Sequence, residues 1–441
     1  MRRPARLRAA ALALATAALL GRPGGAQSPL PGPAPAPAPP AAEETGPPAP
    51  RVYDLRYEAR LVPSQRVARV TVRLGSGAAL VRWVRFAVDP QRHVDFRGDG
   101  AVEAEPGAVR WTPPRAGGAL HYTFRIDHLR DATSYDAHVT ETWALFRGDD
   151  LVPPARVDAE RGALARARLR LRLPDGWRAA VPFERLPDGR YAIENPERRF
   201  DRPTGWIALG RLGVLREKIA GSHVAVAAPV GQGARRLDLL ALLRWTLPAL
   251  RDLLGALPDR VLVAAAGDPM WRGGLSGPRS VYVHAGRPLI APDGTSPLLH
   301  ELFHAVVRPQ AGPGGDWVVE GLAELYSLEL LVRSKTIGKA RYRRALERFA
   351  RRGAGVAALD VEVATGPVAA RAVTALHALE RELRAGSGGA IGLDHVVARL
   401  AGERGEITTE RFRRLVDEVA GRSLGGFFRA NVPLARQPAL P

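Results

Sequence analysis

The sequence predicts a multidomain α+β protein in which an N-terminal antiparallel β domain precedes an α/β core and a C-terminal helical region. Three observations lead to this prediction. Apolar and polar residues alternate with a period of two over residues 51–217, which is typical of half-buried strands. Over residues 218–350, a short strand and a glycine-rich segment are interspersed with apolar residues at helical spacing. Residues 351–435 continue this helical spacing, and the length of 441 residues is too great for one ordinary domain.

The first 26 residues have the pattern of a secretory signal peptide. Four arginines, a short apolar run and the small residues Gly24 to Ala26 follow one another in the order of such a signal. The apolar run is short for a membrane span, although an uncleaved N-terminal anchor is the alternative. We therefore expect an exported protein, periplasmic or secreted, without an integral membrane span after cleavage. Residues 27–50 are rich in proline and alanine and predict an extended tether.

The composition limits the chemistry that the chain can perform. Cysteine is absent, which excludes disulfides, cysteine nucleophiles and thiolate metal sites. A transition-metal site would have to use His, Asp and Glu. The net charge of +19 becomes +14 without the five arginines of the predicted signal. This arginine excess is typical of a genome-wide composition bias more than of a binding adaptation, although a basic surface could still attract anionic surfaces or acidic substrates. No nucleic-acid motif accompanies this charge, so we expect no nucleic-acid partner.

The β domain is predicted from four stretches of alternating residues, separated by turn-forming clusters rich in Asp, Gly and Pro. The alternating stretches are VYDLRYEARL, ARVTVRL, HYTFRIDHL and RARLRLRL. The core begins with a predicted helix over residues 235–257, followed by the strand DRVLVAAAG and the glycine-rich segment WRGGLSGPRSVYVH.

A short helix with clear boundary signals carries two histidines on one face. Ser296 is a residue type favoured at the N-cap, and Pro297 fits the first helical position. Pro309 is expected to end the helix. His300 and His304 are four residues apart, so their side chains lie one turn apart on the same face. Two imidazole nitrogens can therefore reach one metal ion.

The residue after the first histidine completes an H-E-x-x-H pattern. In zinc metallopeptidases with this pattern, the histidines hold Zn²⁺ and the glutamate, here Glu301, is the general base. A five-residue match also arises by chance, in which case Glu301 would be a surface acid. A catalytic zinc needs a third protein ligand and an open position for water, so the pattern requires another ligand further along the chain.

A second predicted helix supplies candidates for that ligand. Asp316 is a natural N-cap residue, and residues 317–331 have helical periodicity. Glu320 lies in the first turn, and Glu324 follows one turn later on the same face. With two histidines, Glu320 makes a thermolysin-type ligand set, and Glu324 is expected to orient a ligating histidine. Two alternatives stay open: Glu324 is the ligand, or Glu320 is a solvated acid.

The glycine-rich segment ahead of the zinc helix is a candidate substrate loop. Gly273, Gly274 and Leu275 open the stretch GGLSG, and glycines allow a substrate backbone to approach closely. A tight turn between strands is an equally good interpretation. His284 follows nearby and could touch a substrate, although a histidine in a strand more often only packs there.

Together these residues resemble a known family. HELFH followed by WVVEGLAELY is similar to the gluzincin zinc metallopeptidases, and most closely to the glycyl aminopeptidase-like branch. GGLSG lies where that branch has its substrate loop, WALFRGDDLVPPA and TGWIALGRL resemble its β domain, and the tail resembles its helical region. The resemblance implies a thermolysin-like core, Zn²⁺ held by His300, His304 and Glu320, Glu301 as base, and a peptide or protein substrate.

The sequence departs from this family at three places. The interval between the second histidine and the ligand glutamate is shorter than in the better-known aminopeptidases. The substrate-loop glutamate that recognises a free N-terminus is replaced near Ser276. Val368 and Ala369 occupy the place of a tyrosine that would donate to the developing oxyanion, and removing one such donor costs about 10²–10³ in rate. Tyr326 and Tyr342 are possible substitutes, although we expect Tyr326 to pack in the core.

These inferences predict an exported, zinc-dependent metallopeptidase that hydrolyses peptide bonds. Two other classes fit the same residues. The departures favour a pseudo-enzyme that binds zinc and peptide without turnover, and an envelope scaffold protein with a structural zinc is the third interpretation. The sequence predicts neither the oligomeric state nor the choice between exo- and endo-cleavage.

Overall fold

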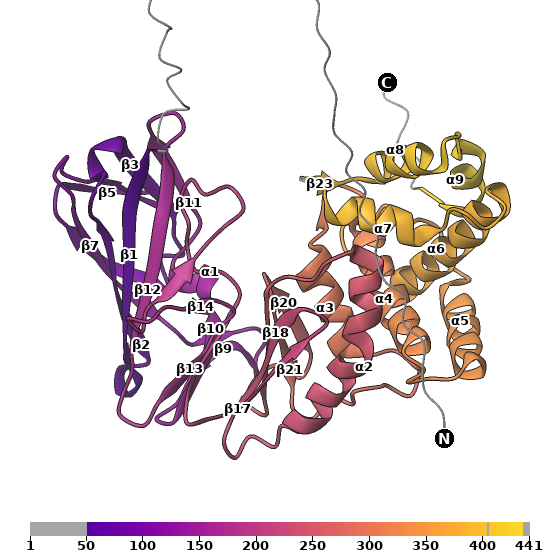
Figure 1. The fold of residues 1–441 in the computed structure, drawn as a ribbon, viewed down its shortest axis with the longest axis horizontal. Coiled ribbons are helices and arrows are strands. Elements are labelled where there is room, and N and C mark those ends of the chain that lie inside the picture. Colours follow the sequence, from indigo (N-terminus) through magenta and orange to yellow (C-terminus); the bar gives the residue numbers. More distant parts are fainter. Residues whose placement is uncertain (1–50, 404, 435–441) are drawn as a thin grey trace, which may run out of the picture. The chain divides into compact units, whose positions relative to one another are not determined.

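The structure, a computed structural model, describes residues 51–403 and 405–434. The predicted signal peptide and tether, residues 1–50, lie outside the described residues. Strands dominate the first half of the described chain and helices the second half, as Figure 1 shows. This organisation confirms the predicted multidomain α+β class with an N-terminal β domain. The predicted boundaries at 217 and 350 stay predictions, and a strand of the core sheet crosses the first of them.

Three sheets make up the β domain, and their named strands pair antiparallel except for β1 with β12, which run parallel. The seven-stranded sheet has the order β14 (Glu184–Arg185), β15 (Tyr191–Ile193), β12 (Leu164–Arg172), β1 (Val52–Val62), β2 (Val67–Leu74), β7 (Gly118–Arg125), β4 (His93–Gly98). The four-stranded sheet has the order β11 (Ala155–Ala159), β3 (Val81–Ala87), β6 (Ala108–Thr112), β5 (Ala101–Glu105). The third sheet has the order β13 (Arg178–Ala180), β16 (Trp206–Gly210), β10 (Trp143–Arg147), β9 (Tyr135–Val139), β8 (His128–Leu129).

The period-two pattern of the sequence sets which side of each strand is buried. Every second residue of β1 is buried, from Tyr53 to Leu61, while the residues between them are half-buried or exposed. Strands β2 and β7 repeat this alternation and pair with β1 and β2, respectively. One face of the seven-stranded sheet therefore supplies much of the apolar core of the β domain, which also includes Trp111 and Phe146.

The core contains a five-stranded mixed sheet. Its order is β17 (Leu212–Ile219), β18 (Ser222–Pro229), β19 (Arg260–Ala266), β21 (Ser280–His284), β20 (Gly274–Gly277). Strands β18, β19 and β21 run parallel, and helix α2 (Arg236–Leu254) connects the first two, as a parallel connection requires. The central strands β19 and β21 are buried on both faces, which explains their uninterrupted apolar sequence.

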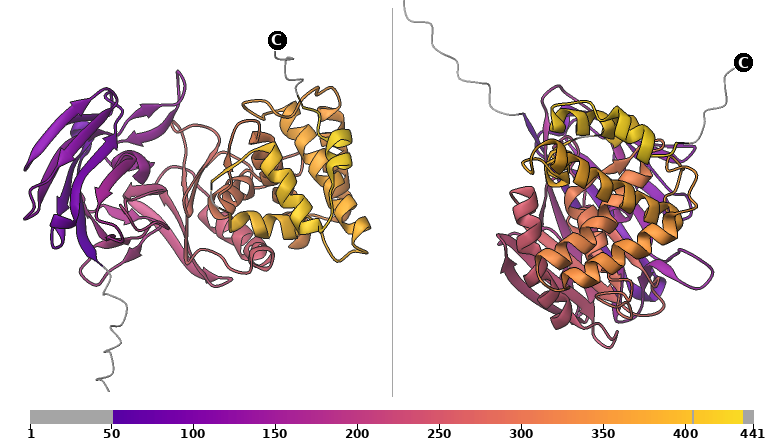
Figure 2. Two further views of the ribbon diagram at one scale, coloured as in Figure 1. Left: turned by 90° about the horizontal axis from the view of Figure 1, so that it is seen from above. Right: turned by 90° about the vertical axis from the view of Figure 1, so that its right-hand side faces the viewer.

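Helices follow the core sheet along the chain. They are α3 (Pro297–Val307), α4 (Asp316–Arg333), α5 (Lys339–Gly353), α6 (Pro367–Gly386), α7 (Leu393–Ala401), α8 (Thr409–Ala420) and α9 (Gly425–Asn431). Short elements complete the described chain: α1 (Gly148–Leu151), the 3₁₀ turns Pro63–Gln65 and Ala78–Leu80, and the pair β22 (Gln310–Ala311) and β23 (Glu406–Ile407). Figure 2 shows α4 to α9 on the side of the core sheet away from the β domain. No helix among the described residues has the length and apolar character needed to cross a membrane.

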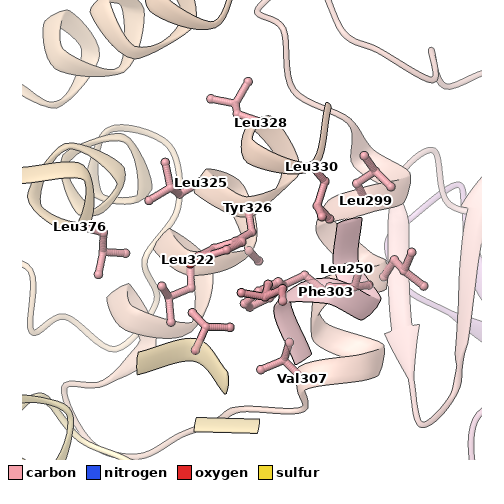
Figure 3. Close-up of a cluster of buried hydrophobic side chains, with 14 of the residues drawn as sticks. Leu250, Leu299, Phe303, Val307, Leu322, Leu325, Tyr326, Leu328, Leu330 and Leu376 are labelled. Carbon is pink, nitrogen blue, oxygen red and sulfur yellow. The ribbon is translucent and has the colours of Figure 1, made fainter. Parts of the chain in front are cut away.

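The apolar sides of α3 and α4 meet in the largest buried cluster. Phe303 of α3 stacks on Tyr326 of α4, with ring centres 5.3 Å apart, and Leu299, Leu322 and Leu330 surround this pair (Figure 3). The two helices are thus fixed against each other by a close-packed core, so polar groups on their remaining faces keep a defined separation.

A third buried cluster joins the β domain to the core, and we call it the junction cluster. Its buried members are Trp143, Leu145, Ala180, Trp206, Ala208, Leu212, Ala227, Leu262, Ala264, Ala266, Met270 and Tyr282. Strand β16 makes the polar contacts beside it: Trp206 N donates to Ser280 Oγ at 2.7 Å, and Trp206 Nε1 donates to Leu275 O at 2.9 Å. The β domain is therefore attached directly to the β20–β21 hairpin.

Candidate metal centre

Helix α3 begins where the sequence predicts. Ser296 is the N-cap, its side chain accepts from Leu299 N at 3.4 Å, and Pro297 is the first helical residue. The helix ends at Val307, because Arg308 adopts a left-handed conformation with φ of 58° ahead of Pro309. These local signals place the histidines within a helix of 11 residues, about three turns long.

Helix α4 begins differently from the prediction. Gly315 is its N-cap residue, and Asp316 is the first helical residue, so the expected Asp316 cap is wrong. Gly315 packs against the chain at Ile407 so closely that an added Cβ would lie 1.7 Å from Ile407 O. The Asp316 carboxylate instead accepts from Ala364 N at 2.7 Å, so a tertiary hydrogen bond replaces the local one.

Three side chains of α3 and α4 converge on one point. His300 Nε2 lies 3.1 Å from His304 Nε2 and 3.3 Å from Glu320 Oε2, while His304 Nε2 lies 3.4 Å from Glu320 Oε1. All three residues are half-buried, and among the described residues they are the one group of His, Asp or Glu that could jointly hold a metal ion. The structure thus brings together the three residues that the sequence suggested as ligands.

The spacing of these atoms fits a zinc ion. Zn²⁺ binds imidazole nitrogen at about 2.0–2.1 Å and carboxylate oxygen at about 2.0–2.2 Å in tetrahedral geometry, which separates neighbouring ligand atoms by about 3.4 Å. The observed separations of 3.1, 3.3 and 3.4 Å are close to that value. Two nitrogens and one carboxylate are also the donor types that a cysteine-free zinc site would use.

The pKa values of the cluster show that it is organised around one positive charge. Burial lowers the pKa of His300, but its hydrogen bonds with Glu320 and Glu324 outweigh this effect and raise the pKa to about 10. Burial, together with the charge on His300, lowers the pKa of His304 to about 4. Burial raises the pKa of Glu320, but both histidines bring it below its ordinary value. A metal ion among the same atoms would replace the proton on His300.

Glu324 supports His300 from the side away from the cluster. Its Oε2 lies 2.9 Å from His300 Nδ1, so the ring presents Nε2 to the other two donors. A carboxylate in this position fixes the tautomer and orientation of a ligating histidine. Glu324 therefore contacts His300 Nδ1, as an orienting residue does, whereas Glu320 contacts the Nε2 atoms of both histidines, as a ligand does.

Glu301 lies beside the cluster and against the glycine-rich strand β20. An added Cβ on Gly274 would lie 2.6 Å from Glu301 Cγ, so the absence of a side chain at Gly274 gives the glutamate its room. Burial raises the pKa of Glu301, whereas the charge on His300 and hydrogen bonding by Ser276 lower it, and the net shift is upward. A carboxyl group with a raised pKa is better suited to accept and return a proton near neutral pH.

A cleft of about 670 Å³ opens over these groups. Gly274 and Leu275 line it together with the cluster residues, and their role in binding a substrate stays a prediction. Gly273 lies instead against the indole of Trp271, whose nearest ring atom would be 1.9 Å from an added Cβ. Trp271 also lines the cleft.

Three other residues singled out in the sequence face elsewhere. His284 is buried in β21, where its Nδ1 accepts from Gly286 N and its Nε2 lies 3.3 Å from Asp268 Oδ1. The Tyr326 hydroxyl donates to Asp394 Oδ1 at 2.7 Å, and the Tyr342 hydroxyl donates to Glu329. No tyrosine is among the described residues that line the cleft.

Sequence reasoning missed several residues of the cleft. Arg130, Arg147, Arg308 and Trp271 all line it. The β-domain arginines were not distinguishable in the sequence, because arginine is abundant along the whole chain and neither residue belongs to a motif. Arg308 could have been noted, since it directly follows α3.

Comparison with known proteins gives matches at the level of structure. No protein-family profile matches the sequence, and no curated protein matches it. The fold is similar to that of an aminopeptidase N family protein from Idiomarina loihiensis, with a TM-score of 0.66 and 14% identity over 88% of this chain and 77% of that chain. It is also similar to an M1 zinc metallopeptidase from Deinococcus radiodurans, with a TM-score of 0.57 and 18% identity over 89% of this chain and 95% of that chain.

A single-residue variant of the Deinococcus radiodurans metallopeptidase gives the same TM-score of 0.57, with 17% identity. The similarity therefore extends over the β domain, the core and the helical region together, because it covers nearly nine tenths of this chain. At these identities, it establishes that the chain has the multidomain fold found in these metallopeptidase structures.

Proposed function

We propose that the protein is a zinc metallopeptidase of the gluzincin type that hydrolyses peptide bonds within the cleft. The observation that carries this proposal is the convergence of His300 Nε2, His304 Nε2 and the Glu320 carboxylate at zinc-like separations, beside Glu301. The similarity to zinc metallopeptidase structures supports it. A thermolysin-like core and a relation to the glycyl aminopeptidase-like branch are the finer parts of the same proposal.

His300, His304 and Glu320 would hold the metal, and Glu324 would keep His300 in its ligating orientation. When bound, Zn²⁺ lowers the pKa of a coordinated water and polarises a substrate carbonyl. Glu301 accepts a proton on its carboxylate from the attacking water and later returns it to the leaving nitrogen. The backbone of β20 positions the substrate, because Gly274 lines the cleft without a side chain beside Glu301.

We also propose that the protein is exported, periplasmic or secreted, because residues 1–26 have the pattern of a signal peptide. Sequencing the N-terminus of the protein isolated from separate cell fractions tests this proposal. An intact Met1 in the cytoplasmic fraction alone contradicts it.

The test of the enzymatic proposal compares the wild type with Glu301→Gln. We expect both proteins to contain one zinc per chain by elemental analysis. The wild type should cleave members of a mixed peptide library, and the variant should be slower by about 10²–10⁴, the usual contribution of a general acid–base group. Wild-type protein that contains no zinc, when purified without a chelator, would refute the proposal.

A second candidate function, a zinc- and peptide-binding pseudo-enzyme, is favoured by one observation. No tyrosine is placed to stabilise an oxyanion among the described residues that line the cleft. The same experiment separates the two, because a pseudo-enzyme holds zinc in both proteins and cleaves nothing in either. A structural zinc in a scaffold protein predicts, in addition, no binding of peptides in the cleft.

A further inference from the structure

Three arginines line the cleft that contains the candidate metal centre. Arg130 follows β8 and Arg147 ends β10, so both come from the β domain, whereas Arg308 directly follows α3. Arg130 and Arg308 are exposed and Arg147 is half-buried. Positive charge from two parts of the chain therefore meets at one opening.

Two of these arginines stack on tryptophans that flank strand β20. Arg130 Cζ lies 4.3 Å from the ring centre of Trp271, and Arg147 Cζ lies 5.2 Å from that of Trp206. Trp206 is itself bonded to Leu275 O in the strand. Stacking holds a planar guanidinium in place and leaves its in-plane N–H groups available for a carboxylate, so less entropy is lost on binding.

The three guanidinium groups lack the carboxylate partners that some other arginines of this protein have. Arg82 pairs with Asp158, for example, and Arg244 with Glu217. Within residues 51–403 and 405–434, no carboxylate lies within 4.0 Å of the guanidinium nitrogens of Arg130, Arg147 or Arg308.

The guanidinium of Arg147 is also incompletely hydrogen-bonded. Its Nε is buried and has no hydrogen-bond partner in the described part of the chain. Buried polar groups are nearly always hydrogen-bonded, so the described chain leaves the guanidinium of Arg147 incompletely satisfied.

The acidic residues of the cleft form no ion pair with these arginines in the described part of the chain. Besides Glu301 and Glu320 of the metal centre, the described lining includes two carboxylates, Asp316 and Glu362. Asp316 accepts from Ala364 N, and Glu362 is exposed. A Zn²⁺ ion at the metal centre would balance the charges of Glu301 and Glu320, which leaves three arginines against two carboxylates in the described lining.

We propose that the cleft takes acidic peptides, whose carboxylates bind Arg130, Arg147 and Arg308. This inference rests on the proposed peptidase function for turnover, whereas the binding that it describes requires none. Planar guanidinium groups bind carboxylates through two parallel hydrogen bonds, and no described carboxylate lies within 4.0 Å of the guanidinium nitrogens of these three arginines. Peptides with lysine at the same positions are repelled.

The first test measures binding without catalysis. Fluorescein-labelled peptides of one length carry either Asp, Asn or Lys at their central positions, and each is made with a free or an amidated C-terminus. They are titrated against the Glu301→Gln protein by fluorescence anisotropy, with and without zinc. We expect the Asp peptides to bind about tenfold or more tightly than the Asn peptides at low salt, with the difference shrinking as salt rises. Equal affinity for the three sequences, or preference for Lys, overturns the proposal.

The two types of terminus distinguish the sources of the carboxylate. A preference for Asp that persists in amidated peptides assigns the arginines to substrate side chains. If the Asn peptides bind more tightly with a free than with an amidated C-terminus, the arginines recognise the terminal carboxylate. Either result supports recognition of an anionic peptide by these arginines.

Single substitutions test the residues themselves. Arg130→Gln, Arg147→Gln and Arg308→Gln should each lower the preference for Asp over Asn by several-fold. Arg147→Lys should retain only part of the preference for Asp over Asn, because an ammonium group keeps the charge but lacks the planar pair of donors. Arg115→Gln is the matched control, since Arg115 is an exposed arginine in the turn between β6 and β7.

Circular dichroism and thermal unfolding verify that each variant is folded. Should Arg147→Gln not fold, the variants of the exposed Arg130 and Arg308 decide the outcome. Full retention of the preference for Asp in folded variants contradicts the proposal.

Turnover by the wild type separates this inference from the proposed function. Internally quenched Asp and Asn peptides are compared by kcat/KM. Equal cleavage of the Asp and Asn peptides supports the proposed peptidase function and contradicts the proposed preference for acidic peptides. If the protein binds acidic peptides selectively but cleaves neither set, the proposed peptidase function is wrong and the proposed recognition of acidic peptides is supported.

Discussion

Glu324 contacts the face of His300 that points away from the metal centre, and it does so from a different helix. The orientation of the ligand histidine therefore depends on a residue that touches neither metal nor substrate. Such outer carboxylates usually affect metal affinity more than the chemistry itself.

Replacing Glu324 with alanine should weaken zinc binding by about 10–100-fold, the usual cost of losing such a partner. Glu324→Gln should cost less, because its amide oxygen still accepts from His300 Nδ1. Competition with a chromophoric zinc chelator measures both affinities. Glu418→Ala, which removes an exposed acid of α8, is the control, and a Glu324→Ala protein with the control's affinity would contradict the orienting role.

Asp201 is a second residue whose environment matters, because its raised pKa makes the stability of the protein depend on pH. Its side chain is fully buried, and Arg198 Nε lies 2.8 Å from its Oδ2. Burial raises the pKa of Asp201 from 3.8 to about 6, although the Arg198 charge opposes this shift. The folded protein therefore retains this proton at pH values where the unfolded chain has lost it.

This difference predicts how stability changes with pH. Between about pH 4 and 6 the folded state binds more protons at Asp201 than the unfolded state, so the free energy of unfolding falls as the pH rises. The loss attributable to this residue is on the order of 3 kcal/mol, at 1.36 kcal/mol per pKa unit. Asp201→Asn removes it, so the stability of the variant should decline less from pH 4 to 7 in denaturant unfolding. Parallel pH profiles for the two proteins would rule out this role.

At the scale of elements, strand β20 and helix α3 pack closely where Gly274 lacks a side chain and Glu301 occupies the space. Gly274 leaves space for Glu301, and the strand belongs to a sheet that also packs on α3. The strand thus determines where the carboxylate of the helix can lie.

Gly274→Ala should displace Glu301, because the new methyl carbon would lie 2.6 Å from its Cγ. We expect peptide cleavage to fall more than about tenfold, since small misplacements of a catalytic group have large effects on rate. Zinc content should stay at one per chain, because the ligands lie elsewhere. Gly355→Ala is the control, since nothing lies within 4 Å of its added Cβ. Unchanged activity in Gly274→Ala would show that Glu301 is not held by this contact.

The elements near the site differ in how far the sequence predicts them. Helix α3 was predicted well, because Ser296, Pro297 and the residues around Pro309 act locally. The start of α4 was not, because Asp316 bonds to Ala364, which is distant in sequence. The ligand triad was suggested by spacing, since residues on one helix face are separated by known intervals. The cleft arginines required the fold, because only the packing of the β domain brings Arg130 and Arg147 beside α3.

At the scale of the whole molecule, long-range pairings set the arrangement of the described chain. β1 lies between β2, its neighbour in sequence, and β12, which pairs with it in parallel from residue 164 onward. Period-two alternation predicts strands but not their partners, so this exception to the antiparallel pattern was not predictable. The multidomain class was predictable, because its signal is spread over many residues.

Zinc binding should stabilise the whole protein. The proposed ligands belong to α3 and α4, so the ion binds the folded state and not the separated helices. At free zinc about 100-fold above its dissociation constant, the gain is about 2.7 kcal/mol. We expect chelation to lower the melting temperature by several degrees in differential scanning fluorimetry. A His300→Ala, His304→Ala double variant should not respond to the chelator, and a wild type that loses zinc without a shift would contradict this coupling.

The junction cluster has a consequence for how the chain is assembled during synthesis. Trp143 and Trp206 belong to β10 and β16, which leave the ribosome before their partners Leu262 and Tyr282 of the core sheet. N-terminal domains generally begin to fold first, so the β domain passes through a period in which this apolar surface is uncovered. A fragment cut between residue 210 and the core sheet would carry that surface permanently and would tend to aggregate. The β domain of this protein is thus a poor candidate for transfer to another chain as an independent module.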